Sequence, residues 1–188
     1  DFEHVIGKRV EVLENEKYAG SVVNVIASTK FIKGPHGAPC TRLLKKDVRK
    51  AYQRDGDVQV FGYTAEEEGR ANRFIDANND VDCVFPLLEK GITKKQCLEF
   101  VDDMGIVIPK MYRLGYQNNN CIGCVKGGMG YWNAIRVDFP AKFYEMAAIE
   151  RVVGHSINKD ADGPVYLDEL DPNRGSFERD MPGDCGFT

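Results

Sequence analysis

The sequence predicts an α/β protein in which helices cover a parallel sheet, followed by an irregular C-terminal tail. The first observation is that apolar segments typical of strands alternate with segments of helical spacing. The second is the length of the intervening helical segments, about 10–15 residues, which is typical of connections in parallel sheets. The third is the composition of residues 155–188, where Gly, Pro and Asp are frequent and indicate turns.

The N-terminal segments begin this alternation. Residues 9–14 alternate apolar and polar side chains, which predicts a half-buried strand. Residues 21–29 place apolar side chains at helical spacing, and Ser21 can cap that helix. A Gly- and Pro-rich loop over 33–40 follows, and a helix with one apolar and one basic face then begins at Thr41.

Two further strands are expected in the middle of the chain. Residues 57–64 alternate as a strand does, and residues 81–89 are mostly apolar, which is typical of a strand buried on both faces. Each strand precedes a helix that begins with a capping box, in which a Thr and a later Glu or Gln bond each other's backbone amides. These boxes are Thr64 with Glu67 and Thr93 with Gln96.

The last third of the chain combines a glycine-rich segment with one clear helix. Four glycines lie within residues 121–130, and Pro140 then begins a helix that Gly154 ends. We therefore expect two parts, namely an α/β domain over 1–154 that includes the glycine-rich segment, and a Gly/Pro/Asp-rich tail over 155–188 that wraps on this domain.

Charge and hydropathy exclude several classes of protein. The 188-residue chain carries 25 Lys and Arg against 29 Asp and Glu, a net charge of −4. Because neutralising phosphates needs a basic excess, this balance argues against a general nucleic-acid-binding protein. The sequence contains no apolar run long enough to span a membrane and no signal peptide, so we expect a cytoplasmic protein without a membrane partner. The chain does not begin with Met, which leads us to expect a processed or longer protein.

The Cys121-x-x-Cys124 pair is the strongest local signal for chemistry. Two thiolates at this spacing can hold one metal ion because the intervening turn brings both sulfurs to one point. The same spacing also occurs in redox pairs. Two small apolar residues in a turn are the alternative, although the polar and glycine-rich flanks make an apolar pocket an unfavourable setting.

Cys40, Arg42 and Lys45 lie at the start of the basic helix. The first amides of a helix are unpaired and attract an anion, either a phosphate or a thiolate. Arg42 and Lys45 add positive charge there, and Arg70 lies where ligands of parallel sheets bind. The alternatives are a solvated basic face for the first helix and an ion pair with a neighbouring carboxylate for Arg70.

The remaining cysteines divide into two kinds. Cys185 lies among glycines near the C-terminal end, where a cysteine is more often reactive than packed. Cys83 and Cys97 lie on the apolar sides of a strand and a helix, so we expect both to be packing residues.

Several segments together resemble the phosphoadenosine phosphosulfate (PAPS) reductase family, within the wider group of N-type ATP pyrophosphatases. The likeness is to the bacterial and bacteriophage reductase-like proteins, and the Cys-Ile-Gly-Cys block is its most specific element. The matching segments are GAPCTRLLKKDVRKAY (37–52), VFGYTAEEEGRANRF (60–74), PLLEKGITKKQCLEF (86–100), the run from MYRLGYQNNNCIGCVKGGMGYW onward (111–150), VYLDELDP (165–172) and DCGFT (184–188).

This resemblance implies an adenine-nucleotide-binding α/β fold, of the adenine nucleotide alpha hydrolase kind, over residues 1–154. It also implies a [4Fe–4S] cluster, for which Cys40, Cys121 and Cys124 match three ligands, while Thr41 replaces a fourth. Either Cys185 or a further residue completes the set, or the metal is Zn²⁺, or no metal binds.

The reductases carry their nucleophile in a tail motif, Glu-Cys-Gly-hydrophobic-His. DCGFT is similar, with Cys185 as the implied catalytic residue, but Asp184 replaces the Glu and Thr188 replaces the His. The family's phosphate-binding loop, Ser-Gly-Gly-x-Asp-Ser, does not occur in this sequence, and we expect it to precede Asp1.

Three functions are compatible with this pattern. The first is thiol-dependent reduction of a sulfated adenine nucleotide, PAPS or APS, in which Arg42, Lys45 and Arg70 hold the anionic groups and a thioredoxin-like protein is the reductant. The second is ATP-dependent insertion of sulfur into tRNA or DNA, the only function in which nucleic acid is a partner. The third is a non-catalytic nucleotide- or metal-binding module.

Overall fold

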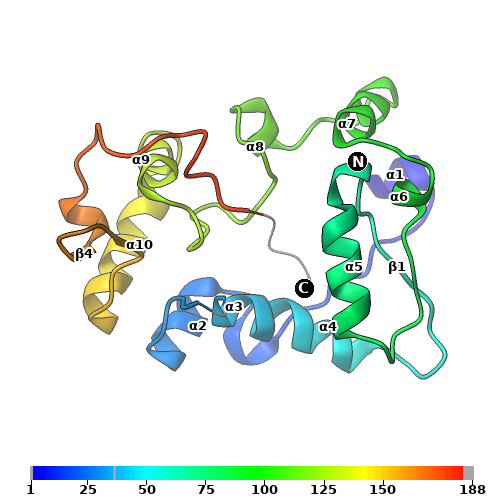
Figure 1. The fold of residues 1–188 in the computed structure, drawn as a ribbon, viewed down its shortest axis with the longest axis horizontal. Coiled ribbons are helices and arrows are strands. Elements are labelled where there is room, and N and C mark those ends of the chain that lie inside the picture. The colour runs from blue at the N-terminus through cyan, green and yellow to red at the C-terminus, as the bar shows by residue number, and fades with distance from the viewer. Residues whose placement is uncertain (1, 36, 184–188) are drawn as a thin grey trace. The chain divides into compact units, whose positions relative to one another are not determined.

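The computed structural model describes residues 2–35 and 37–183, which form two compact units that interleave along the chain (Figure 1). The first unit comprises residues 2–12 and 50–109, and the second comprises residues 13–49 and 110–183. The predicted boundary between Gly154 and His155 lies inside the second unit. Among the described residues, no helix combines the length and the apolar character needed to cross a membrane.

The first unit contains one pair of parallel strands. In this pair Gln59 lies opposite Cys83, and Val60 lies opposite Val84. The side chains of Phe61, Phe74 and Phe85 pack beside the strands, with Phe61 and Phe74 ring centroids 4.5 Å apart. The elements of this unit are α1 (Phe2–Ile6), β1 (Gln59–Val60), η3 (Ala65–Glu67), α5 (Glu68–Ala77), β2 (Cys83–Val84), α6 (Pro86–Glu89) and α7 (Lys94–Asp103).

The parallel pairing and both capping boxes are confirmed. Thr64 and Thr93 each receive the predicted reciprocal bonds, and helices follow both. The larger helix-covered sheet is not confirmed, because the described part of this unit holds only these two short parallel strands. The protein is mixed α/β, and its parallel sheet extends over two residues in each strand.

Two predicted strands differ from the structure. Residues 9–14 form no regular structure, and Val12 is 82% exposed. Alternation alone did not produce a strand there, since a strand also needs a neighbour to receive its backbone hydrogen bonds. The segment 81–89 is not a single buried strand, because Pro86 begins helix α6 and Val84 in β2 is 36% exposed.

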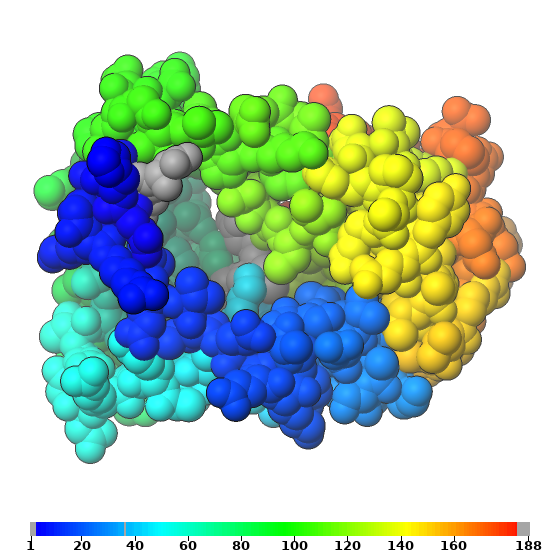
Figure 2. Space-filling model, turned by 180° about the vertical axis from the view of Figure 1, so that it is seen from behind, coloured from blue at the N-terminus to red at the C-terminus, as the bar shows by residue number. Residues whose placement is uncertain are grey.

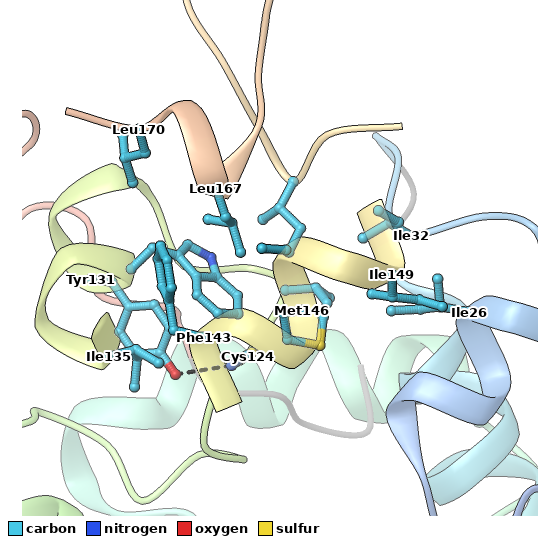
Figure 3. Packing of buried hydrophobic residues seen from close by; sticks show 14 of the residues in the cluster. Ile26, Ile32, Cys124, Tyr131, Ile135, Phe143, Met146, Ile149, Leu167 and Leu170 are labelled. Atoms are coloured by element: carbon cyan, nitrogen blue, oxygen red, sulfur yellow. Dashed lines mark hydrogen bonds between the residues drawn. The ribbon is translucent and has the colours of Figure 1, made fainter. Parts of the chain in front are cut away.

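The second unit is built from helices around one apolar cluster (Figure 3). Helix α10 packs against α2 and α9, and Figure 2 shows α10 in yellow against the blue segment that contains α2. Trp132, Phe143 and Met146 are fully buried in this cluster. The elements are η1 (Glu16–Tyr18), α2 (Val22–Thr29), α3 (Pro39–Thr41), η2 (Arg42–Lys46), α8 (Lys110–Arg113), α9 (Met129–Asp138), α10 (Pro140–Val153), β3 (Asn158–Lys159), β4 (Pro164–Val165) and η4 (Leu167–Glu169), with α4 (Asp47–Tyr52) continuing η2.

Local sequence signals determine the ends of these helices. Ser21 accepts the predicted capping bond from the amide of Asn24, at 3.3 Å, and α2 follows. Helix α10 begins at Pro140 and ends at Gly154, which adopts the left-handed conformation with φ of 72°. The basic helix begins at Pro39 rather than Thr41, because Pro is favoured at the first helical position, and its residues 42–46 have π-helical hydrogen bonding.

The segment after Gly154 is more regular than the sequence predicts. It forms the antiparallel hairpin of β3 and β4 and the short helix η4, and Ile157 and Leu167 are buried in the cluster. The side chain of Glu150, fully buried on α10, holds this hairpin. Its carboxylate accepts hydrogen bonds from the backbone amides of Ile157 and Leu167, the latter at 2.7 Å.

Burial raises the pKa of Glu150 to about 7, although the two backbone amides partly oppose the increase. Since the folded state then binds this proton more tightly than the unfolded state does, the contribution of Glu150 to stability is greatest at low pH. We expect the free energy of unfolding to fall by up to about 3 kcal/mol as pH rises from about 4.5 to about 7. Urea unfolding between pH 5 and pH 8 (roughly this window) measures the decrease.

Glu150→Gln is the matched control, because its amide does not titrate. We expect the wild-type chain to lose stability relative to this variant as pH rises. Parallel pH dependences in the two chains would contradict the assignment of the titration to Glu150.

Candidate functional site

The Cys121–Cys124 turn is held by a buried tyrosine from helix α9. The hydroxyl of Tyr131 accepts a hydrogen bond from the amide of Cys124, at 2.9 Å (Figure 3). The same hydroxyl donates a hydrogen bond to the carbonyl of Cys121, at 3.3 Å. Burial raises the pKa of Tyr131, so the hydroxyl keeps the proton that it donates. One side chain therefore provides a hydrogen-bond partner for a backbone group at each end of the turn.

Gly123 is required inside this turn for two reasons. Its φ of 72° lies in the left-handed region, which favours glycine. A β-carbon at this position would also lie 3.0 Å from the side chain of Lys142 and 3.2 Å from that of Trp132. The turn thus lies directly on α9 and α10, where larger residues would separate it from both helices.

The three predicted metal ligands differ in exposure. Cys124 is buried in the apolar cluster with 8% of its surface exposed, while Cys121 is exposed. Cys40, the second residue of α3, is half-buried and packs against the same cluster. The fold therefore brings Cys40 and Cys124 to one cluster, although they are distant in sequence.

These cysteines do not form a complete metal site in the structure. None of the five described cysteines is in a disulfide. The described ranges, 2–35 and 37–183, contain no group of three or more His, Cys, Asp or Glu side chains placed to share one ion. We therefore derive no chemical step through a metal, and the iron–sulfur cluster and the zinc alternative stay predictions.

Lys33 lies near Cys124 and Glu150. Burial lowers the pKa of Lys33, and the charges of Cys124 and Glu150 oppose that decrease. Lys33 stands in a Gly- and Pro-rich loop, where no local pattern distinguishes it from the other lysines of the chain. Its proximity to the buried thiol depends on the fold of the second unit.

The N-terminus of α9 is capped by a carboxylate from the tail. Asp180 Oδ2 accepts hydrogen bonds from the amide of Gly130, at 2.7 Å, and from that of Ser176, at 2.8 Å. The carbonyl of Asp180 accepts a third bond from the amide of Gly128, at 2.8 Å. A negative charge at this end of a helix is favoured by the unpaired amides and the helix dipole.

The close approach of the tail explains the glycines of the glycine-rich segment. A β-carbon on Gly130 would lie 2.3 Å from the backbone of Ser176, and one on Gly128 would lie 2.8 Å from the side chain of Asp180. In the structure these glycines admit residues 176–180 against α9.

Side-chain amides hold the next part of the tail beside the cysteine turn. Asn118 and Asn120 donate to the carbonyl of Pro182, at 3.3 Å and 3.1 Å, and Asn120 also reaches the carbonyl of Gly183 at 3.4 Å. Asn120 immediately precedes Cys121. Cys185, the predicted nucleophile, lies outside the described residues.

The predicted anion-binding residues lie in different units. Arg42 and Lys45 belong to the second unit, where the Arg42 side chain is 66% exposed and lies 3.4 Å from Asp47. Arg70 belongs to the first unit, where it forms an ion pair with Glu67 and lies over the ring of Tyr63 at 4.6 Å. Arg70 therefore forms the ion pair that was the alternative to anion binding, and Arg42 lies on an exposed basic face.

Tyr131, Asp180 and the Asn118–Asn120 pair were not predicted from the sequence. Tyr131 both packs in the apolar cluster and bonds the cysteine turn. The glycine-rich segment was the one available signal, because four glycines in ten residues indicate a close approach of another backbone. The sequence does not reveal that the approaching residue is Asp180, 50 positions away.

Comparison of this chain with known protein families, with curated proteins and with solved structures finds no match. The resemblance to the PAPS reductase family therefore rests on the residues quoted above.

Replacing Tyr131 tests the anchoring of the cysteine turn. In Tyr131→Phe the buried amide of Cys124 loses its acceptor, which costs about 1–3 kcal/mol. We expect the Cys124 amide to exchange with solvent at least tenfold faster, roughly the lower end of that cost. Hydrogen exchange followed by NMR measures the rate. Tyr144→Phe, at an exposed tyrosine of α10, is the control, and equal protection of Cys124 in both variants would contradict the anchoring role.

Proposed function

We propose that the protein is a PAPS reductase-like enzyme that reduces a sulfated adenine nucleotide by thiol chemistry. The Cys185 thiolate attacks the sulfur of the nucleotide's sulfate group, and the bond from sulfur to the phosphate oxygen breaks. The products are a cysteine thiosulfonate and the desulfated nucleotide. A thioredoxin-like dithiol then releases sulfite, regenerates the Cys185 thiol and is itself oxidised to a disulfide.

The observation that carries this proposal is the attachment of the tail to the cysteine turn. The amides of Asn118 and Asn120 hold Pro182 and Gly183, and Cys185 follows Gly183 by two residues in sequence. A nucleophile on a tail must be delivered to one place, and these bonds supply such an anchor. Asp180 on α9 is a second anchor for the same segment.

The basic helix supports the nucleotide part of the proposal. Arg42 and Lys45 lie one turn apart in the second unit, the unit that also contains the cysteine turn. Arginine and lysine there offer donors to phosphate and sulfate oxygens. Arg70 pairs with Glu67 in the first unit, and Arg42 pairs with Asp47 at 3.4 Å. The Arg42 side chain is 66% exposed and lies in the unit of the cysteine turn, so Arg42 and Lys45 are the candidates for binding the substrate.

The test is sulfite release from PAPS and from APS by the full-length protein, with reduced thioredoxin as the electron donor. We expect Cys185→Ser to abolish the reaction, because a hydroxyl does not replace the thiolate as nucleophile. Cys97→Ser is the matched control. That half-buried thiol lies on α7 in the first unit, its burial raises its pKa, and we expect turnover to be retained.

Unchanged turnover in Cys185→Ser would contradict the proposal. A second assay separates it from ATP-dependent sulfur insertion. Release of pyrophosphate from ATP in the presence of tRNA or DNA, without sulfite release from PAPS or APS, would favour that other class. Visible absorption near 400 nm of the anaerobically purified protein (roughly where cysteine-bound iron–sulfur clusters absorb) tests the cofactor separately.

A further inference from the structure

A cavity of about 670 Å³ lies in the second unit, and its described lining includes no residue of the cysteine turn. One wall is the loop after α2, which contributes Phe31 and Lys33. The segment after α10 also lines it, including His155, Asn158 and Lys159, as does Tyr166 after β4. Cavities of about 300–1,000 Å³ are typical of small-molecule sites.

The cavity has a positive lining. Lys33 and Lys159 contribute two ammonium groups, His155 contributes an imidazole, and the described lining includes neither Asp nor Glu. Within the part of the chain that the structure describes, neither lysine forms an ion pair. The half-buried position of Lys33 also lowers its pKa, so a bound anion would favour its charged form.

Nearby carboxylates are already engaged by other groups. Asp160 accepts hydrogen bonds from the amides of the hairpin turn and pairs with Arg174 at 2.7 Å. Asp168 pairs with Arg151, also at 2.7 Å. Glu150 accepts the two backbone amides that hold the hairpin. In the described part of the chain none of these carboxylates forms an ion pair with Lys33 or Lys159, although the charge of Glu150 acts on Lys33.

Asn158 supplies an independent observation. It is 7% exposed and lines the cavity, and its side-chain Nδ2 has no hydrogen-bond partner among the described residues. Its backbone carbonyl is engaged, since Ser156 Oγ donates to it at 2.6 Å. A buried amide donor without an acceptor costs about 1–3 kcal/mol, which a ligand oxygen can recover.

Two aromatic residues add an apolar part to the lining. Phe31 is 47% exposed, and the ring of Tyr166 contacts Arg151, whose guanidinium carbon lies 3.8 Å from the ring centroid. A bare inorganic anion would leave these rings and most of the volume unused. The lining therefore fits an anion attached to an organic body.

We propose that this cavity binds the phosphate or sulfate group of a small organic ester through Lys33, Lys159 and the side-chain amide of Asn158, with the ester's body against Phe31 and Tyr166. The binding test uses inorganic ions and a simple ester, so its outcome does not depend on whether the protein reduces a sulfated nucleotide.

The experiment is an NMR titration of the ¹⁵N-labelled full chain with sodium phosphate and with sodium sulfate at constant ionic strength. We expect a saturable shift of the Asn158 side-chain amide signal, which Asn158→Ser identifies by its disappearance. Lys33→Gln should weaken the apparent affinity at least tenfold, about 1.4 kcal/mol. Lys159→Gln changes the second lysine of the cavity, which is exposed, and we expect this variant also to bind the anions more weakly than the wild type.

Lys17→Gln is the matched control, because Lys17 is exposed in the same unit and lies outside the cavity. We expect this variant to bind phosphate and sulfate with the affinity of the wild type. Phenyl phosphate should bind more tightly than inorganic phosphate, and Tyr166→Ser should remove only that advantage. The proposal of an anion site would be overturned if the Asn158 signal did not shift. It would also be overturned if both lysine variants bound the anions as tightly as the control does. Equal affinities for phenyl phosphate and inorganic phosphate would overturn the claim that the body of the ester packs against Phe31 and Tyr166.

Discussion

The carboxylate of Asp180 on the N-terminus of α9 is the interaction on which the organisation of the second unit depends. It accepts a hydrogen bond from the amide of Gly130, which the helix leaves unbonded, and it does so from a segment 50 residues further along the chain. Hydrogen bonds from amides to an ionised carboxylate are stronger than neutral ones, at about 1.5–3 kcal/mol each. Only glycine at positions 128 and 130 lets the tail approach closely enough for these bonds to form.

Helix α9 joins the two parts of the candidate site. Tyr131 at its start bonds both ends of the cysteine turn, while Asn133 and Arg136, further along, donate to backbone carbonyls between Leu167 and Arg174. In Figure 1 the orange-to-red tail runs across this helix. The position of the cysteine turn and the path of the tail are therefore coupled, which is what delivery of a thiol on the tail would require.

Local signals in the sequence predicted local structure well. Ser21 and the two Thr-based capping boxes lie where the helices begin, because a cap involves residues only three apart. The strand over 9–14 was wrong, since a strand depends on a partner that the alternating pattern does not specify. The Cys121–Cys124 turn was recognised, but Tyr131 and Asp180 act across the folded chain, and the sequence contains no spacing rule for such contacts.

The most direct test of this account is the exchange rate of the Gly130 amide in Asp180→Ala, with Glu178→Ala in the same tail as the control. Loss of the carboxylate should expose an amide that is bonded at 2.7 Å, and we expect its protection to fall at least tenfold, roughly the lower end of the energy of one charged hydrogen bond. Protection in Glu178→Ala should equal that of the wild type. An unchanged Gly130 exchange rate in Asp180→Ala would contradict the claim that this carboxylate holds the tail on α9.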